Sequence, residues 1–362
     1  MRAAVCREFG GPLRIEDLEL DPPEHGEARV RIVACAICHS DLALAEGAWG
    51  GALPAVYGHE AAGAVAEIGP GVESVAPGDR VVVSLLRSCG HCFFCERGEL
   101  HLCEGAFPGD REGRLRTHDG EHVLAAMHTA AFAEEVVVDQ SQLAVVPPSI
   151  SLEVASLLGC GVATGFGAVV DRAEVPAGSS VVVIGAGGVG LNCVQAAAFR
   201  GAETIVAADL SGAKRDAALA FGATRAVDPA DADLELEVRA LTGRRGADYV
   251  FVTVGEGSVV EHGLRCVRRG GTLVVVGMPP SGDAFRVVGV DLVHDDIRIL
   301  GSKMGSARLS QAVPRLVELY EEGVLKLDEL ITARFPLERI EEAMSASRNG
   351  EALRNLVVLG SE

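Results

Sequence analysis

Four cysteines in one short stretch have the spacing of a tetrahedral metal site. Intervals of two residues separate Cys89, Cys92 and Cys95, and seven residues separate Cys95 from Cys103. Structural zinc takes four soft or borderline ligands and keeps no open position for chemistry. The spacing therefore predicts a structural zinc lobe over about 87–105.

The same thiols could instead form disulfides or stay free. The chain has ten cysteines and no apolar signal peptide after Met1. Because clustered cysteines in a reducing compartment are more often metal ligands, we expect zinc and a cytoplasmic location. Gly90 and Gly98 would let the backbone bend around the ion.

A glycine-rich segment has the composition of a dinucleotide-binding turn. Residues 185–190 are Gly-Ala-Gly-Gly-Val-Gly, between an expected strand and an expected helix. Gly185 permits a sharp turn, Gly187 lets a pyrophosphate approach the backbone, and Gly190 lets the helix pack closely on the strand. The alternative is a plain glycine-rich turn.

Asp209 ends the next expected strand, nineteen residues after Gly190. A carboxylate there accepts hydrogen bonds from the adenosine-ribose hydroxyls and repels a 2′-phosphate. We therefore predict NAD rather than NADP. The alternative is a solvated loop acid.

A third set of residues is scattered. Cys38, His59 and Cys160 could supply three ligands and leave a fourth position open, which is the stoichiometry of a catalytic zinc. Their sequence spacing does not nominate them, because a buried cysteine or histidine is also ordinary in a protein core.

Two regions of the chain, which differ in their expected secondary structure, have to position these residues. From Met1 to about Val146, short β-prone runs such as 28–33, 63–68 and 80–83 indicate an all-β domain built as a small barrel or sandwich. From about Ala163, apolar strands alternate with helical patterns, which predicts a doubly wound parallel sheet. Its expected strands are 181–184, 204–208, 225–228, 249–254, 272–276 and 297–301, with helices at 191–200 and 214–221. A tail follows, with helices at 306–322 and 337–349 and a last strand at 355–359.

Composition narrows the class of protein. At 362 residues the chain is long enough for two domains. It holds 48% hydrophobic and 23% charged residues, and no apolar run has the ~20 residues that span a bilayer. A net charge of −19 disfavours nucleic acid as a partner. We expect a protein that binds neither membrane nor nucleic acid.

Five motifs together resemble the zinc-containing medium-chain alcohol dehydrogenases of the medium-chain dehydrogenase/reductase superfamily. They are Cys38-His39-Ser40-Asp41, Gly58-His59-Glu60-Ala61-Ala62-Gly63, the four-cysteine lobe, Leu158-Gly159-Cys160-Gly161 and the glycine segment 185–190. Their order and spacing match that family over essentially the whole chain. The resemblance implies a GroES-like catalytic domain from 1–161 and 305–362, and a Rossmann NAD-binding domain over 162–304.

The resemblance also implies roles for single residues. Cys38, His59 and Cys160 match the catalytic zinc ligands, and Glu60 matches a nearby acid that can act as an alternate ligand. Asp41 matches the carboxylate that orients the zinc histidine, and Ser40 the hydroxyl that receives the alcohol proton. The implied coenzyme-binding residues are His39, Gly185, Gly187, Gly188, Val189, Gly190, Asp209, Lys214 and Arg354.

The activity implied by the resemblance is reversible oxidation of an alcohol by hydride transfer to NAD, with one catalytic and one structural zinc per chain. Some relatives end the proton relay with a histidine where this chain has Ala43. His39, the coenzyme ribose or solvent would then finish the transfer. Trp49, Leu85 and Phe132 resemble pocket-wall positions and suit a primary hydrophobic or aromatic alcohol, although core packing is an equal reading.

Three alternatives to this activity stay open. Thiol-dependent formaldehyde dehydrogenases place an acid and an arginine where this chain has Trp49 and Phe107. Zinc-free quinone reductases share the architecture but usually lack both cysteine sets. A protein that binds zinc and coenzyme without turnover is the third alternative. The 28 residues between Cys103 and Phe132 resemble the longer loop of dimeric members, so we expect a homodimer rather than a tetramer.

Overall fold

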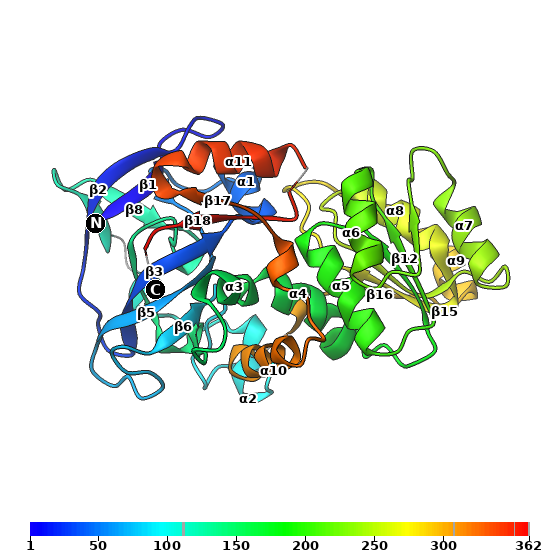
Figure 1. Cartoon of the computed structure of the whole chain (residues 1–362), viewed down its shortest axis with the longest axis horizontal. Coiled ribbons are helices and arrows are strands. Elements are labelled where there is room, and N and C mark those ends of the chain that lie inside the picture. The colour runs from blue at the N-terminus through cyan, green and yellow to red at the C-terminus, as the bar shows by residue number, and fades with distance from the viewer. Residues whose placement is uncertain (111–112, 307, 351, 361–362) are drawn as a thin grey trace. The chain divides into compact units, whose positions relative to one another are not determined.

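The computed structural model describes residues 1–110, 113–306, 308–350 and 352–360. The chain divides into two compact units (Figure 1). The first unit joins Met1–Gly161 to Ala307–Glu362, and the second unit is Val162–Ser306.

The first unit contains a small closed barrel. Its strands follow the order β1-β2-β7-β8-β4. They are β1 (Arg2–Cys6), β2 (Arg14–Leu20), β7 (Leu115–Thr117), β8 (His122–Ala125) and β4 (Ala55–Val56).

A seven-stranded sheet lies beside the barrel in the same unit. Its order is β10-β6-β5-β3-β18-β17, and β9 also pairs with β3. The strands are β3 (Glu27–Ala36), β5 (Glu60–Ile68), β6 (Arg80–Val83), β9 (Glu135–Asp139), β10 (Leu143–Val145), β17 (Ile331–Pro336) and β18 (Arg354–Val358). Strand β18 pairs antiparallel with β3, with Val357 opposite Cys35. The last part of the chain therefore completes a sheet that its first part begins.

Short helices connect these strands. The helices of the first unit are α1 (His39–Ala45), α2 (Phe93–Glu96), α3 (Leu152–Ser156), α10 (Leu309–Glu321) and α11 (Ile340–Arg348). Its 3-10 turns are Leu100–Leu102, Pro108–Asp110, Ala126–His128, Gln140–Gln142, Leu157–Gly159, Asp328–Leu330 and Leu337–Arg339. One apolar core joins the barrel and the sheet, and it includes Val30, Ile32, Val81, Val83 and Phe132. β-branched side chains pack well on such a pleated surface.

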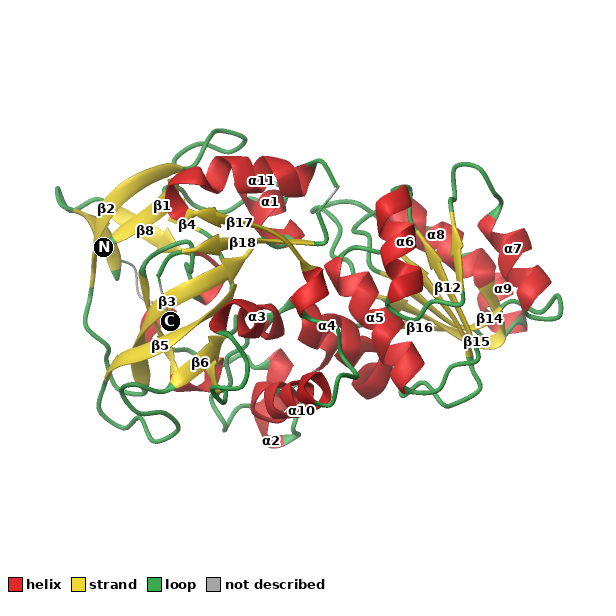
Figure 2. Cartoon of the chain, viewed as in Figure 1, coloured by secondary structure: helices red, strands yellow, loops and turns green. Residues whose placement is uncertain are grey.

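The second unit is a six-stranded, fully parallel sheet in the order β13-β12-β11-β14-β15-β16. The strands are β11 (Ser180–Ile184), β12 (Thr204–Ala208), β13 (Arg225–Val227), β14 (Ala247–Val252), β15 (Val267–Val275) and β16 (Arg298–Gly301). Helices α5 (Gly188–Phe199), α6 (Gly212–Ala220), α7 (Leu234–Leu241), α8 (Gly257–Cys266) and α9 (Gly289–His294) lie on both sides of it (Figure 2). Helix α4 (Gly161–Gly167) continues into a π-helical turn, Ala168–Arg172, and a 3-10 turn covers Met304–Ser306.

The central strand β11 is apolar over its last four residues. Val181, Val182, Val183 and Ile184 are all buried. Parallel sheets are covered on both faces, so such strands carry no polar alternation. The predicted α/β class, with a β-rich domain and a doubly wound parallel sheet, is confirmed.

Several element boundaries differ from the prediction by one to five residues, and one of them lies in the glycine segment. The helix expected at 191–200 begins at Gly188, inside the glycine segment. Glycine carries no apolar side chain, so the helical periodicity starts later in the sequence than the helix itself.

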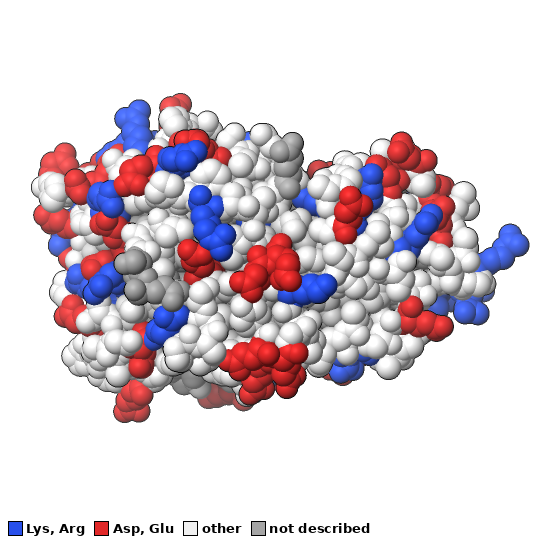
Figure 3. All heavy atoms as spheres, in the orientation of Figure 1, with Lys and Arg blue, Asp and Glu red and all other residues white. Residues whose placement is uncertain are grey.

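No single helix among the described residues is long and apolar enough to cross a membrane. The segments Leu152–Gly159 and Gly161–Arg172 reach that length and composition only when taken together, and their residues are mostly buried. On the face drawn in Figure 3, basic side chains are interspersed with acidic ones.

Candidate metal centres and coenzyme site

Cys38, His59 and Cys160 meet in the first unit, and all three are buried. Their ligand atoms lie within 4.8 Å of one another. The strand register brings Cys38 and His59 together, because Ala36 at the end of β3 pairs with Glu60 at the start of β5. Cys38 follows β3 and His59 precedes β5, so both reach the same end of the sheet.

Asp41 fixes the histidine of this trio. Its Oδ1 lies 3.0 Å from His59 Nδ1 and accepts the Gly58 amide at 3.0 Å. Its Oδ2 accepts the Cys38 amide at 3.0 Å. An ionised carboxylate only accepts hydrogen bonds, so the proton of the neutral ring belongs on Nδ1.

The other ring nitrogen is then a free electron-pair donor. His59 Nε2 is buried and has no hydrogen-bond partner among the described residues. A buried polar atom without a partner destabilises the fold unless a ligand satisfies it. Two sulfurs and one imidazole nitrogen suit zinc, and three donors leave a fourth position open. The trio is therefore a candidate catalytic zinc site.

Without an ion, the three ligands share protons among themselves. A hydrogen bond from Cys160 holds the pKa of the Cys38 thiol well below its ordinary value, against the effect of burial, and the same contact raises the pKa of Cys160. Burial acts to lower the pKa of His59, but the charges of Asp41 and Cys38 outweigh it and raise that pKa. A bound cation would replace these protons.

Glu60 and Arg354 form a buried ion pair next to the trio. Glu60 Oε2 lies 3.5 Å from Arg354 Nε, and Glu60 Oε1 accepts the Gly161 amide at 2.6 Å. Burial raises the pKa of Glu60 to about 7, although the Arg354 charge opposes it. The pairing of β18 with β3 brings Arg354 to this place.

The remaining predicted residues of the first unit have mixed surroundings. His39 is exposed and Ser40 partly exposed, at the start of α1. Trp49 and Leu85 are partly exposed, as a pocket wall would be. Phe132 is fully buried in the apolar core, and its amide donates to the Tyr57 carbonyl at 2.9 Å. Their roles toward alcohol and coenzyme stay predictions.

Two buried polar side chains that we did not predict hold the backbone beside two of the ligands, and a third, Gln142, holds the backbone of one of these two residues. Ser84 Oγ donates to the Gly159 carbonyl at 2.8 Å, and Gln142 Nε2 donates to the Ser84 carbonyl at 2.8 Å. Thr129 Oγ1 donates to the Gly58 carbonyl at 2.8 Å. A serine ending the apolar run 81–83 was the available sequence signal.

The four cysteines of the predicted lobe also converge. Cys89 follows β6, Cys92 is the N-cap of α2 and Cys95 lies on that helix. Cys103 follows the turn Leu100–Leu102, and all four sulfurs lie within 4.8 Å of one another. The amides of Cys89 and Gly105 donate to Cys103 Sγ, both at 3.3 Å.

Disulfides do not explain this cluster. All ten cysteines are free, and the Cys92 and Cys103 sulfurs are 3.9 Å apart, against about 2.05 Å in a disulfide. The Glu104 amide, with other donors, lowers the pKa of Cys92 to about 6, whereas burial raises that of Cys95 to about 12. Four thiols at this spacing form a candidate structural zinc site.

The glycine segment of the second unit has the form of a phosphate cradle. Gly185 has φ +95°, and Gly187 caps α5 directly after β11. A Cβ on Gly190 would lie 1.8 Å from the Gly185 carbonyl oxygen, so only glycine fits there. A Cβ on Gly187 would meet nothing within 4 Å. Gly188 and Val189 open the helix, whose first-turn amides favour an anion.

Asp209 follows β12 and is tied to that turn. Its Oδ2 accepts the Ala186 amide at 2.8 Å and its Oδ1 the Ser211 amide at 2.9 Å. Lys214 lies on α6, partly buried. A nicotinamide coenzyme therefore fits the carboxyl end of β11, where the strand order of the sheet reverses.

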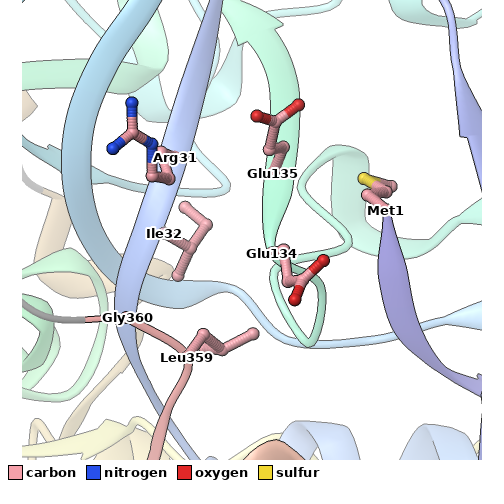
Figure 4. A pocket seen from close by; sticks show the side chains of 7 residues that line it. All are labelled: Met1, Arg31, Ile32, Glu134, Glu135, Leu359 and Gly360. Carbon is pink, nitrogen blue, oxygen red and sulfur yellow. The ribbon is translucent and has the colours of Figure 1, made fainter.

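Two other cavities lie away from these residues. One of about 380 Å³ in the first unit is lined by Met1, Arg31, Ile32, Glu134, Glu135, Leu359 and Gly360 (Figure 4). Another of about 280 Å³ in the second unit includes Ser180, Asp248 and Arg268, at the amino ends of the strands. Neither contains a predicted site residue.

Comparison with known proteins agrees with this arrangement. Residues 24–148 match the family described as "Alcohol dehydrogenase GroES-like domain", and residues 188–322 match "Zinc-binding dehydrogenase". Together these matches cover most of the chain.

Three relatives extend the likeness to the whole chain. An "NDMA-dependent alcohol dehydrogenase" of Amycolatopsis methanolica is 37% identical, over 99% of this chain and 98% of its own. An "Alcohol dehydrogenase class-3" of Cereibacter sphaeroides is 36% identical, over 99% of each chain. The crystal structure of benzyl alcohol dehydrogenase from Acinetobacter calcoaceticus superimposes with a TM-score of 0.92 at 29% identity, over 99% of each chain.

The motifs, the fold and the two converging ligand sets thus agree with full-length relatives of one kind. The chain belongs to the zinc-binding medium-chain alcohol dehydrogenase family and is an oxidoreductase of the alcohol dehydrogenase type.

Proposed function

We propose that this chain is a zinc- and NAD-dependent alcohol dehydrogenase that reversibly oxidises a primary hydrophobic or aromatic alcohol. The convergence of Cys38, His59 and Cys160, with His59 Nε2 buried and without a partner among the described residues, is the observation that carries the proposal. Zinc held by these three residues would lower the pKa of a bound alcohol.

The neighbouring residues then act on position and protons. Asp41 keeps the His59 ring turned toward the ion, because it accepts the Nδ1 proton. Ser40 receives the alcohol proton at the start of α1. Since Ala43 offers no side chain for a relay, the exposed His39, the coenzyme ribose or solvent carries the proton onward.

NAD supplies the hydride acceptor when bound. Asp209 supports NAD over NADP, because its carboxylate lies at the end of β12 and would repel a 2′-phosphate. The glycine turn 185–190 and Lys214 would bind the adenosine and pyrophosphate parts. His39 and Arg354 remain proposed coenzyme ligands from the first unit.

The preference for aromatic alcohols has two supports. Trp49 and Leu85 offer partly exposed apolar surface on the first unit. The superimposed benzyl alcohol dehydrogenase is named for an aromatic alcohol. An apolar pocket wall favours such substrates.

Thiol-dependent formaldehyde oxidation is the second candidate, and the class-3 relative at 36% identity favours it. The residues at the expected carrier-binding positions do not. Trp49 and Phe107 stand where an acid and an arginine are expected. Arg87 lies 4.3 Å over the Phe107 ring, but it pairs with Asp110 at 2.6 Å.

A substrate panel tests these proposals. Purified protein with its metal content measured is assayed with ethanol, benzyl alcohol, a long-chain alcohol and formaldehyde with glutathione, each with NAD and with NADP. We expect two zincs per chain and the largest kcat/KM for benzyl alcohol with NAD. Activity confined to formaldehyde with glutathione would favour the second candidate, and two zincs without any turnover would favour a binding protein.

We also propose that two copies of the chain form a homodimer through the second unit. Strand β16 lies at the edge of its sheet, and no other strand in the described part of the chain pairs with its outer side. The segment before it is exposed although it is rich in apolar side chains, namely Phe285, Val287, Val288, Val290 and Val293. An apolar edge of this kind usually pairs or is covered.

A further inference from the structure

Arg215 of α6 reaches back to the loop that carries Asp209. Its Nη1 atom lies 2.8 Å from the Asp209 carbonyl oxygen and 2.9 Å from the Leu210 carbonyl oxygen. The same nitrogen lies 2.7 Å from Asp228 Oδ2, just past the end of β13. One guanidinium therefore joins the loop after β12 to the loop after β13.

The loop that Arg215 holds carries the Asp209 carboxylate, and both oxygens of this carboxylate accept hydrogen bonds from backbone amides. Asp209 Oδ2 accepts the Ala186 amide of the glycine turn, and Oδ1 accepts the Ser211 amide. These two bonds aim the carboxylate only while the backbone at 209–211 stays in place. Arg215 bonds to two carbonyls of this segment, those of Asp209 and Leu210.

The positive charge of Arg215 is also paired with the carboxylate of Asp228. The exposed fraction is 23% for the Arg215 side chain and 20% for that of Asp228. The Asp228 carboxylate compensates the positive charge of Arg215 and so weakens its attraction for an incoming phosphate. Arginine so close to Asp209 would otherwise favour a coenzyme with a 2′-phosphate.

We propose that Arg215, anchored by Asp228, is a positioning residue for coenzyme selection. Arg215 holds the 209–211 backbone so that the Asp209 carboxylate can accept hydrogen bonds from the ribose hydroxyls. Asp228 pairs with the Arg215 guanidinium, which is then less available to bind a 2′-phosphate. This inference rests on the proposed NAD preference of the same site.

Calorimetric titration of the full-length zinc-loaded chain with NADH and with NADPH tests this role. We expect Arg215→Ala to weaken NADH binding by about tenfold, a change of roughly 1.4 kcal/mol. The Kd for NADPH should stay within about threefold, so discrimination falls. Arg215→Lys should recover part of the NADH affinity, and Asp228→Asn should lower discrimination in the same direction by a smaller factor.

The matched control is Arg225→Ala, because Arg225 lies on β13 and pairs with Glu237 on the surface. It should leave both affinities unchanged. If Arg215→Ala weakens NADPH as much as NADH, or if Asp228→Asn leaves discrimination unchanged, the positioning role is wrong. If the unaltered chain binds NADH and NADPH equally, the NAD proposal fails and this inference fails with it. Thermal unfolding of each variant separates loss of binding from loss of fold.

Discussion

At the residue scale, the chemistry of this chain depends on which ring nitrogen of His59 is left to bind a metal ion. Asp41 accepts from Nδ1 and from the amides of Cys38 and Gly58, so one carboxylate orients both the imidazole and the backbone around it. Nε2 is left without a partner among the described residues. A carboxylate behind a metal-binding histidine commonly has this effect.

Replacing Cys160 by serine should remove the catalytic ion and keep the fold. We expect kcat/KM to fall by at least about 10³-fold, because a Lewis acid contributes several kcal/mol to such a reaction. Metal analysis should show the loss of one zinc per chain, and circular dichroism should be unchanged.

Cys266→Ser is the control, because Cys266 is equally buried and its Sγ lies 3.6 Å from the His262 carbonyl. It should keep both zincs and nearly full activity. A Cys160→Ser protein that retains both activity and zinc would exclude Cys160 as a ligand.

At the element scale, strands and turns place the ligands through their backbones. Cys38 and His59 meet because β3 and β5 pair with Ala36 opposite Glu60. Cys160 is held differently, since Ser84 after β6 bonds to the carbonyl of the preceding Gly159.

Ser84→Ala should therefore disturb the catalytic metal site without removing a ligand. It leaves the Gly159 carbonyl without this donor in a buried place, which destabilises by about 1–3 kcal/mol. We expect a weaker affinity for cobalt at the catalytic site and an altered visible spectrum of the cobalt-substituted protein.

Ser74→Ala is the matched control, because Ser74 Oγ donates to Gln140 Oε1 at an exposed position. It should leave the cobalt spectrum as in the unaltered chain. Identical spectra for all three proteins would argue against a positioning role for Ser84.

The second unit has a pH-dependent link between its strands. Asp248 of β14 accepts the Ser180 amide at 2.7 Å and Arg268 Nε at 2.6 Å. Partial burial acts to raise the pKa of Asp248, but its bonds from Ser180 and Arg268 outweigh that effect and hold the pKa below its ordinary value. The stabilisation is then complete above the unfolded pKa of about 3.9 and is lost as the pH falls through the lower folded pKa.

Asp248→Asn should lower the free energy of unfolding by about 1 kcal/mol at pH 7, a value reduced by solvent screening. Urea unfolding from pH 7 down to pH 3 should show the difference from the unaltered chain shrinking below about pH 4. Asp216→Asn, at an exposed position on α6, should show no such trend. A difference that grows at low pH would contradict the role given to Asp248.

At the scale of the whole molecule, each unit has its own sheet, and the first unit carries both candidate metal centres. The four-cysteine lobe has all its ligand positions filled by sulfur, so zinc there would stabilise the fold and take no substrate. Loss of that ion should therefore act on stability before it acts on chemistry.

Cys92→Ser should lower the melting temperature by about 5 °C or more and reduce solubility, because structural zinc contributes directly to folding. The fraction that stays folded should keep an intact catalytic site, so kcat per active site should change little. Differential scanning calorimetry with active-site titration measures both quantities. A loss of kcat at unchanged melting temperature would contradict a structural role.

The proposed homodimer predicts a separate effect of surface charge. Val293→Asp places a carboxylate in the exposed apolar segment before β16, where Val293 is 80% exposed. Sedimentation should shift from dimer toward monomer. Leu236→Asp, on α7 and 65% exposed, is the matched control and should sediment as the unaltered chain. A monomeric unaltered chain would exclude the dimer.

The sequence by itself determined the structural lobe, the coenzyme turn and the fold class. These depend on neighbours in the chain, since Cys89, Cys92 and Cys95 lie a few residues apart and the glycines of 185–190 act on one turn. Local backbone geometry therefore decides what such residues do. The catalytic trio was predicted only through the family resemblance, because Cys38 and His59 have no spacing typical of a metal site and Cys160 lies 101 residues after His59.

Only the tertiary structure decided what lies around those ligands. The pairing of β18 with β3 carries Arg354 to Glu60, and burial raises the pKa of that carboxyl to about 7. Ser84 and Thr129 bond from distant segments to the backbone beside Cys160 and His59, and Gln142 bonds to the Ser84 carbonyl. Asp228 meets Arg215 because β13 lies next to β12. Such contacts arise from strand order and burial, and neither can be predicted from the spacing of residues along the chain.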